Sequence, residues 1–399
     1  MSPTSDQERT LDRSSLGQYP RLPDLWNQRR MTLEMAIQEH DIVFVGGGLS
    51  AMLLLQELRT ALPERVAVVD PTPLTERSPV HWSYWSHEQT PYDRFATGVW
   101  RKARVGDLPP EPITPFALRL VRSTDVFAHL DESLESVPIE WLFTTARSIT
   151  SRADGLYEIA TDTANLRARW VFDSAIDLDP VFPSPHEPRA VESGTGIRVE
   201  ADRPVFDAET ATLFDPIEEH SFAYLLPFSP VEALLESASF GAVAVEDERA
   251  PLLRFLRKRY QGARFRVTHA ENGTIPLGFA PRRTTGPRHI LLGAKRGLIK
   301  PSAGYGIVRI ARESKHLARL WRENRPLPPS WRSAWQWRIL DKGFLRLAAQ
   351  DPRLPLALLH RVMGSIPLAQ SLSFIDEELP IGQLAPLLRS ASPVIFGSS

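Results

Sequence analysis

The feature that most constrains this chain is a glycine turn set between two apolar segments near residue 41. Residues 41–45 are rich in β-branched apolar side chains, which predicts a buried strand, and the glycines that follow interrupt it. Residues 51–62 have a helical composition, and a second apolar run at residues 65–69 is followed by Asp70. The sequence therefore predicts a strand, a turn, a helix and a second strand in close succession.

The glycine turn has the spacing of a dinucleotide-binding site. In Gly46-x-Gly48-x-x-Ala51, the first glycine permits the tight turn, the second lets the backbone approach a pyrophosphate, and the small third residue lets the helix pack on the sheet. Asp70, after the second strand, can accept hydrogen bonds from ribose hydroxyls. The alternative is an ordinary glycine turn in an α/β sheet. The predicted cofactor-binding group is Gly46, Gly47, Gly48, Leu49 and Asp70.

A second glycine cluster late in the chain bears on which cofactor is bound. Residues 289–293 predict a strand that ends in glycine, and a helix is predicted from Ile307 to about Glu323. Flavoproteins with a split nucleotide fold return such a late strand, turn and helix to the cofactor, where the helix N-terminus can hold phosphate or the ring edge. FAD is therefore favoured over NAD, and a glycine-proline loop without a ligand is the alternative. The predicted contacts are Gly293, Pro301, Gly304, Tyr305 and Gly306.

The predicted fold class is α/β, with a Rossmann-like FAD-binding domain, an antiparallel substrate sheet and a helical C-terminal region. Alternating segments between residues 196 and 240 predict the antiparallel strands, with a brief turn or helix start at residues 230–235. The predicted units are a low-order N-terminal leader at 1–38, the FAD-binding domain at 39–195 with 285–325, the substrate sheet at 196–284 and a helical cap at 326–399.

Composition limits the chemistry that the chain can perform. The sequence has no cysteine, which excludes disulfides, thiolate metal ligands and cysteine nucleophiles. The histidines show no metal-ligand spacing and no Ser/His/Asp order is recognisable, so we predict neither a metal site nor a hydrolase. No run of about 18 apolar residues occurs, which argues against a transmembrane helix.

Charge is unevenly distributed along the chain. The first 250 residues hold 22 Lys and Arg against 40 Asp and Glu, whereas the last 149 hold 25 against 8. Either the two parts attract each other in the fold, or the basic part faces nucleic acid or an anionic lipid surface.

Seven stretches in the chain form an ordered series of motifs: His81–Trp85, Arg203–Asp215, Phe222–Pro230, Ala233–Glu236, Gly273–Leu277, Lys300–Gly306 and Phe374–Glu378. Together they closely resemble the motifs of the lycopene cyclases. They occur in the order in which that family has them, and the likeness runs from about Asp41 to Leu379.

The resemblance implies a lycopene β-cyclase of carotenoid biosynthesis. Such an enzyme binds FAD non-covalently, requires it reduced by NAD(P)H, and cyclises the ends of linear lycopene to β-ionone rings, as in γ-carotene and β-carotene, without net redox change. It also implies that Glu236 is the acid. A carboxyl kept protonated by burial can protonate a carbon-carbon double bond. Without the resemblance, Glu236 would be interpreted as an exposed carboxylate at a strand end.

The aromatic side chains after the second strand are candidates for an apolar substrate pocket. Trp82, Tyr84 and Trp85 could contact a polyene or a carbocation through their ring faces. The expected partners are lycopene or a related linear carotenoid and a membrane surface, with no nucleic acid, and the expected location is cytoplasmic and peripherally membrane-associated. Two alternatives are a flavin-dependent monooxygenase or reductase acting on another hydrophobic isoprenoid, and a carotenoid carrier without enzymatic activity.

Overall fold

The structure, a computed structural model, describes residues 37–175, 189–241, 249–278, 284–331, 333–385, 387 and 389. The leader predicted at 1–38 lies outside these residues, apart from its last two. Gln38 already belongs to the first strand, which therefore begins before the predicted start at Asp41.

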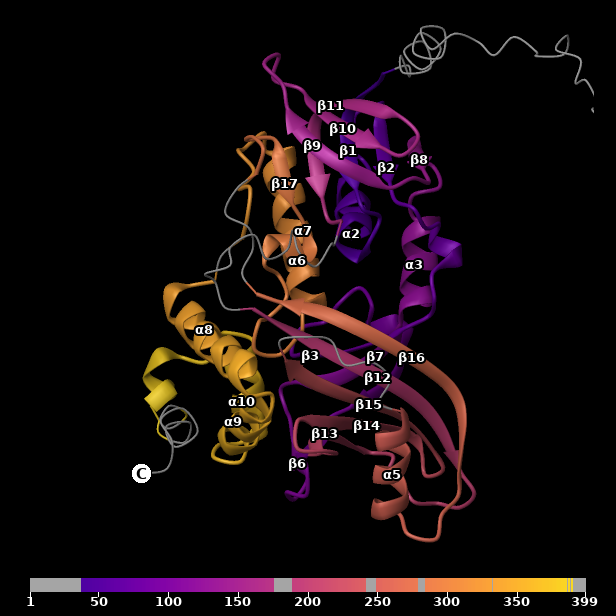
Figure 1. Cartoon of the computed structure of the whole chain (residues 1–399), viewed down its shortest axis with the longest axis vertical. Helices are drawn as coiled ribbons and strands as arrows, with labels where there is room; N and C mark the ends of the chain where they lie inside the picture. The colour runs from indigo at the N-terminus through magenta and orange to yellow at the C-terminus, as the bar shows by residue number, and fades with distance from the viewer. Residues whose placement is uncertain are drawn as a thin grey trace, which may run out of the picture.

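The predicted strand, turn, helix and strand lie at the centre of a mostly parallel sheet (Figure 1). β1 (Gln38–Val45) pairs in parallel with β2 (Val66–Val69) and with β11 (Asn165–Asp173), and α2 (Leu49–Leu58) connects β1 to β2. The sheet is completed by β8 (Ile139–Leu142), β9 (Ala146–Ser151), β10 (Tyr157–Thr161) and β17 (His289–Leu291). Parallel strands joined by helices confirm the predicted α/β class.

Both faces of this sheet are buried, because alternate side chains of β1 enter different cores. Ile42 and Phe44 pack with the leucines of α2, whereas Val43 and Val45 pack with side chains of β10 and β11. The late helix α7 (Ile307–Arg322) lies against α2, close to the bounds predicted from the sequence. The second glycine cluster therefore lies close to the first in the fold.

A second, largely antiparallel sheet lies below the first in Figure 1. The chain turns at residues 230–231, but the helix start predicted within residues 230–235 is wrong, because the chain continues from this turn as a strand that pairs on both sides. β5 and β6 join this sheet from residues well before its other strands. In spatial order the strands are β16 (Phe265–Leu277), β12 (Ala190–Ala201), β15 (Glu232–Gly241), β14 (Ser221–Ser229), β13 (Thr210–Pro216), β5 (Lys102–Val105) and β6 (Glu111–Pro112).

The two faces of the second sheet have different neighbours. Ile197, Val199, Ala233 and Leu235 face α5 (Arg249–Arg259), which supplies Leu252 and Leu256 to that core. The opposite face belongs to the large core that also contains α2 and α7. The face opposite α5 therefore meets the nucleotide-binding part of the molecule.

A small sheet and the C-terminal helices complete the fold. The sheet has the order β3 (His81–Ser86), β7 (Ala117–Arg122) and β4 (Ala96–Trp100), and α3 (Ser123–Glu132) follows β7. The remaining helices are α6 (Gly293–Arg296), α8 (Trp335–Gln350), α9 (Arg353–Met363) and α10 (Leu368–Ile375). Within the described ranges, no helix has both the length and the hydropathy needed to cross a bilayer.

The uneven charge distribution is reflected in ion pairs that join the acidic and basic parts of the chain. Arg259 lies 2.7 Å from Asp215, and Lys295 lies 2.7 Å from Asp173. Arg312 reaches Glu88 of the small sheet's connecting loop at 3.3 Å. Mutual attraction of the two parts, the first of the two interpretations, is therefore present in the fold.

A buried ion pair between Arg296 of α6 and Glu313 of α7 gives a prediction about the stability of the protein. Arg296 is 0 % exposed, and its Nε and Nη2 donate to Glu313 Oε1 at 2.9 and 2.6 Å. Arg296→Met should reduce the free energy of unfolding by about 3–5 kcal/mol, because Glu313 would remain buried without its partner. Urea unfolding measures this change. Arg254→Met breaks the exposed pair with Glu218 and should leave the urea concentration at the unfolding midpoint unchanged. Equal effects of the two variants on this midpoint would contradict the prediction.

Candidate active site

The glycine turn and Asp70 line one cleft. Its volume is about 440 Å³, and Gly46, Gly48, Asp70, Thr72, Glu76, Arg77, Ser78, Ser174 and Ala175 form its wall. The backbone N–H of Gly47 donates to Asp70 Oδ2 at 2.7 Å, and Arg77 Nη2 donates to the same oxygen at 2.9 Å. The structure thus brings the first predicted group together. Sequence analysis missed Arg77, which no local pattern distinguishes from other arginines.

The first and second glycines of the turn meet different surroundings. Gly46 has a φ of +88°, and a Cβ added there would lie 2.7 Å from Ser174 Oγ and 2.9 Å from the Ala175 backbone nitrogen. A Cβ on Gly48, at the N-cap of α2, would meet no atom within 4 Å. Gly46 is therefore required by the protein's own packing, whereas Gly48 leaves its backbone accessible to a ligand phosphate.

The second glycine cluster approaches the first through Gly293. This residue has a φ of +55°, and a Cβ there would lie 2.8 Å from Ser50 Oγ in the first turn of α2. Its left-handed backbone and this close contact both favour glycine. The late segment therefore closes over the N-terminal end of α2.

The loop from Lys300 to Gly306 is fixed by buried charges. Lys300 Nζ lies 2.7 Å from Asp341 of α8 and 3.0 Å from Glu377, and Arg309 of α7 pairs with Glu377 at 3.1 Å. The C-terminal helices therefore hold this loop in place. Pro301 is buried within it.

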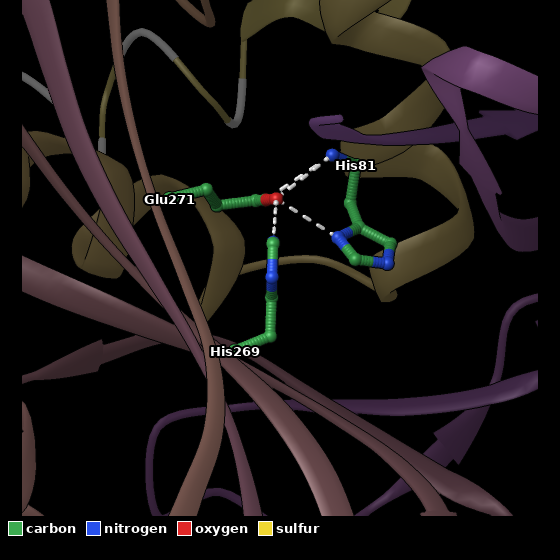
Figure 2. Close-up of side chains that lie close together, drawn as sticks. All are labelled: His81, His269 and Glu271. Carbon is green, nitrogen blue, oxygen red and sulfur yellow. Dashed lines mark hydrogen bonds and ion pairs between the residues drawn. The ribbon is translucent and has the colours of Figure 1, made fainter. Parts of the chain in front are cut away.

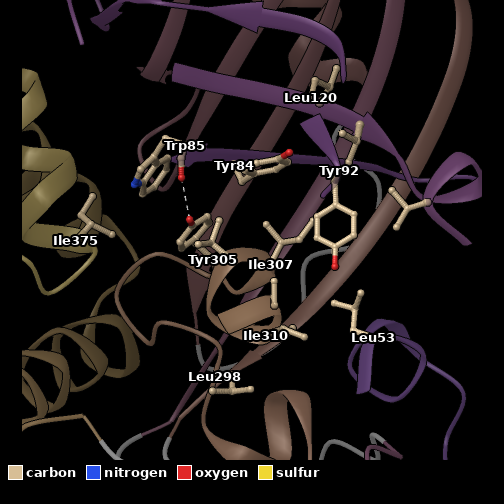
Figure 3. Packing of buried hydrophobic residues seen from close by; sticks show 14 of the residues in the cluster. Leu53, Tyr84, Trp85, Tyr92, Leu120, Leu298, Tyr305, Ile307, Ile310 and Ile375 are labelled. Atoms are coloured by element: carbon tan, nitrogen blue, oxygen red, sulfur yellow. Dashed lines mark hydrogen bonds between the residues drawn. The ribbon is translucent and has the colours of Figure 1, made fainter. Parts of the chain in front are cut away.

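The loop also contacts β3 and the second sheet. The ring of Tyr305 stacks on Trp85 with 4.7 Å between centroids, and its hydroxyl donates to the Trp85 carbonyl at 2.9 Å (Figure 3). Gly304, with a φ of +62°, makes room for Glu192 of β12, because an added Cβ would overlap that carboxyl. The predicted cofactor loop and the predicted substrate sheet meet here.

Glu236 lies in the middle of β15, and its side chain is on the sheet face that meets this loop. It pairs in register with Gly196 of β12 and Tyr224 of β14. Burial raises the pKa of Glu236 to about 8, with further contributions from the nearby carboxyls of Glu271 and, after it, Glu192. The interpretation of Glu236 as an exposed strand-end carboxylate is therefore wrong. Its carboxyl is a neutral acid at pH 7.

Glu192, on the same face, is a second carboxyl whose pKa is shifted. Burial raises its pKa to about 8, and its Oε2 is buried without a hydrogen-bond partner. Tyr224 lies near both acids, and burial and their charges raise the pKa of its hydroxyl well above the ordinary value. Proton-donating groups therefore gather on this face of the second sheet.

Glu271, which contributes to the raised pKa of Glu236, belongs to a group of three residues that sequence analysis did not bring together. His81 of β3 and His269 of β16 both contact Glu271, and their donor atoms lie within 4.8 Å of one another (Figure 2). The hydrogen bonds to Glu271 account for this closeness. The alternation His269-x-Glu271 in a strand was a usable signal, but the contact with His81 spans 190 residues and has no local signature.

The three aromatic residues predicted to line the pocket lie on two faces of β3. Successive strand residues point to opposite faces, so Trp85 shares a face with His81, and Trp82 and Tyr84 occupy the other. Trp82 meets the edge of the Phe127 ring in α3, and the Tyr84 hydroxyl is hydrogen-bonded to Thr90 and Asp93.

Solved structures show a similar overall architecture. A flavoprotein/dehydrogenase from Cytophaga hutchinsonii superposes with a TM-score of 0.56 at 11 % identity, covering 91 % of this chain and 100 % of that one. A geranylgeranyl bacteriochlorophyll reductase-like protein from Thermoplasma acidophilum gives 0.55 at 12 % identity, covering 90 % and 98 %. At these identities the likeness shows the fold, which is that of flavoproteins.

Sequence comparisons identify the family. A lycopene β-cyclase from Paracoccus sp. strain N81106 is 24 % identical over 304 residues, which are 67 % of this chain and 70 % of that protein. The family model described as lycopene cyclase protein matches residues 41–352. This match includes the glycine turn, Glu236 and the loop from Lys300 to Gly306, and it confirms the resemblance inferred from the motifs. The chain belongs to the lycopene cyclase family.

Proposed function

We propose that this protein is an FAD-dependent lycopene β-cyclase that protonates the ends of linear lycopene and forms β-ionone rings without net redox change. The observation that supports this most directly is the Glu236 carboxyl, which is neutral at pH 7 on a buried face beside the cofactor loop. Protonation of an unactivated carbon-carbon double bond needs such an acid in an apolar site.

The cleft at the glycine turn suits the ADP half of FAD. Gly48 exposes its backbone, Asp70 can accept from ribose hydroxyls, and Arg77 adds a positive charge. The remaining predicted contacts are Leu49 beside the turn and Gly293, Pro301, Gly304, Tyr305 and Gly306 in the late segment. When bound in its reduced form, with NAD(P)H as reductant, the flavin would supply negative charge that stabilises cationic character on carbon.

The side chains of this protein perform the proton chemistry in this proposal. Glu236 holds the proton on its carboxyl and delivers it to the terminal double bond. Ring closure leaves a carbocation, and loss of a different proton from a neighbouring ring carbon restores neutrality and leaves the ring double bond. The face of Trp85, fixed by Tyr305, contributes aromatic contact to the pocket. Trp82 and Tyr84 are assigned a supporting role, because they lie on the other face of β3 and pack or hydrogen-bond there.

An anaerobic assay tests the proposed function. Purified protein with dithionite-reduced FAD should convert lycopene to cyclic products without oxygen, because the reaction needs no net oxidation. Chromatography against monocyclic and bicyclic standards identifies the products. Turnover only when oxygen is present would indicate a monooxygenase, and an unchanged polyene bound to the protein would indicate a carrier.

We also propose peripheral contact with a membrane, because a linear carotenoid partitions into bilayers. The sequence favours the mixed Leu and Arg helices between Phe344 and Met363 as the contact face. Just before this range, α8 exposes Trp335 at 72 % and Ile339 at 59 %, one turn apart. Exposed aromatic and aliphatic side chains on a basic helix are typical of interfacial binding.

Cosedimentation with vesicles that contain anionic lipid checks this proposal. Binding should weaken as salt is raised, since each nearby Lys or Arg contributes about 1 kcal/mol that salt screens. Trp335→Ser should reduce binding further. Val99→Ser removes an exposed apolar side chain of β4 and serves as the control. Binding that neither salt nor Trp335→Ser reduces would contradict contact through α8.

A further inference from the structure

Glu271 and Glu236 lie on the two strands that flank β12, and a glycine of β12 lies between them. On β12, Gly196 pairs with Glu236 on one side and with Glu271 on the other. A Cβ added to Gly196 would lie 2.7 Å from Glu271 Cγ and 3.0 Å from its Oε1. The side chain of Glu271 therefore extends over Gly196, toward the strand that carries Glu236.

The carboxylate of Glu271 is held by donors from two strands (Figure 2). The backbone N–H of His81 donates to its two oxygens at 3.1 and 3.2 Å, and His81 Nδ1 donates to Oε2 at 3.0 Å. His269 Nε2 donates to the same oxygen at 3.3 Å. The side chain of His81 is 5 % exposed and that of His269 is 33 % exposed. The carboxylate therefore has a fixed position and several donors that favour its charged form.

We propose that Glu271 is the positioning residue of the Glu236 site, a fixed negative charge that keeps the Glu236 carboxyl protonated until the polyene accepts its proton. This inference deepens the proposed function and rests on it for the role of Glu236. His81 and His269 hold the charge in place, and Gly196 provides the space that it occupies. The pairing of one charged and one neutral carboxyl is the expected outcome when two acids in one site cannot both ionise.

The titration of the two carboxyls agrees with this geometry. Burial alone would raise the pKa of Glu271, but the hydrogen bonds and charge of His81, with a hydrogen bond from His269, hold it below its ordinary value. Burial, then the charge of Glu271 and then the carboxyl of Glu192 raise the pKa of Glu236 to about 8. The donors of Glu271 thus act on Glu236 through the carboxylate that they stabilise.

The other described groups around Glu236 do not supply a compensating positive charge. Glu192 of β12 and Tyr224 of β14 face it, and both are neutral at pH 7 because burial raises their pKa values. From α8, which packs on β12 and β15, Phe344 meets Phe240, and Asp341 is paired with Lys300. Arg198 of β12 lies on the same face, two residues from Gly196, but its charge is paired with Glu232 at 2.7 Å. After burial, Glu271 is the group that contributes most to the raised pKa of Glu236.

The experiment measures the pKa of Glu236 directly, in the flavin-loaded protein without polyene. Glutamate labelled with carbon-13 at the carboxyl reports each titration by NMR, and the signal that disappears in Glu236→Gln is assigned to Glu236. Glu271→Gln removes the charge, so the pKa of Glu236 should fall by about one unit or more. Gly196→Ala should lower it in the same direction, because the added Cβ displaces Glu271 without changing any charge.

A matched variant and an activity profile distinguish this role from a merely structural one. Glu200→Gln removes a carboxylate of β12 that pairs with Arg266 at an exposed site, and the pKa of Glu236 should stay unchanged. Cyclisation by the wild type should be lost as pH rises through about 8, since the acid must be protonated. In Glu271→Gln that loss should move to lower pH, while activity at pH about 6 approaches that of the wild type.

Defined outcomes overturn the proposal. If the pKa of Glu236 is the same in Glu271→Gln as in the wild type, Glu271 is not the charge that sets it. If a chelator changes the pKa of Glu236 in the wild type, a divalent cation bound at His81, His269 and Glu271 sets it, and the proposal is wrong. If the pKa falls as expected but Glu236→Gln still cyclises lycopene, the positioning role stands and the proposed function of Glu236 fails.

Discussion

Glu236→Gln is expected to bind FAD and lycopene like the wild type and to lose cyclisation by about a thousandfold or more. The amide keeps the size of the side chain but has no proton of suitable acidity, and general acid catalysis contributes about 10²–10⁴ in rate. Water cannot replace the carboxyl, because it is too weak an acid to protonate an unactivated carbon-carbon double bond. The products of a single-turnover assay, resolved by chromatography, measure the loss.

Glu232 provides the internal control for this variant. It lies four residues earlier in β15, where its carboxylate accepts from Arg198 Nε at 2.7 Å, and Glu232→Gln should cyclise at close to the wild-type rate. Reaction in deuterated buffer should place one deuterium in each ring formed, as expected for an acid that exchanges with solvent. An active Glu236→Gln beside an inactive Glu232→Gln would mean that the acid has been assigned to the wrong carboxyl.

Gly48→Val is expected to weaken FAD binding by about a hundredfold or more while the protein still folds. An added Cβ would meet no protein atom within 4 Å, so the side chain would enter the space that the proposed site assigns to the phosphates. Loss of charge-assisted hydrogen bonds to the backbone corresponds to about 3 kcal/mol, or about a hundredfold in affinity. Titration of the apoprotein with FAD, followed by flavin fluorescence, gives the dissociation constant.

Two other glycines show whether this loss is specific. A Cβ added to Gly343 in α8 would likewise meet no atom within 4 Å, and Gly343→Val should bind FAD normally. Gly46→Val should instead destabilise the protein itself, because its φ is positive and Ser174 occupies the space. Normal FAD binding by Gly48→Val would show that the flavin does not use this turn.

The sequence predicted those parts of the fold that are determined by residues close together in the chain. The first strand, its glycine turn and Asp70 lie within one short segment, where strand and helix patterns and turn chemistry are read from neighbouring residues. β17 and α7 were also predicted, because each has its own apolar pattern. That β17 and α7 lie close to α2 was predicted from the likeness of the late strand, turn and helix to those of flavoproteins with a split nucleotide fold.

The parts that the sequence did not predict depend on contacts between distant residues. β5 joins the second sheet by pairing with β13, about a hundred positions later in the chain, and no local pattern selects that partner. The proposed role of Glu271 depends on its contacts with Gly196 and His81, which are distant in the sequence. The division of Trp82 and Trp85 between two faces was, by contrast, available from the alternation of a strand.

The pairing of β17 with β11 has a consequence for how the enzyme is made. A ribosome releases the chain from its N-terminus, so β1, β2 and β11 emerge long before residues 289–291, which pair with β11 along its outer edge. The five strands β12 to β16 of the second sheet are synthesised in this interval, and Gly293 and the loop that ends at Gly306 come later still. A nascent chain therefore carries the turn for the ADP half well before it has the segment that closes over α2. In the proposed FAD enzyme, flavin would be retained only by chains whose last third has folded, so cofactor content would report on the folding of that part.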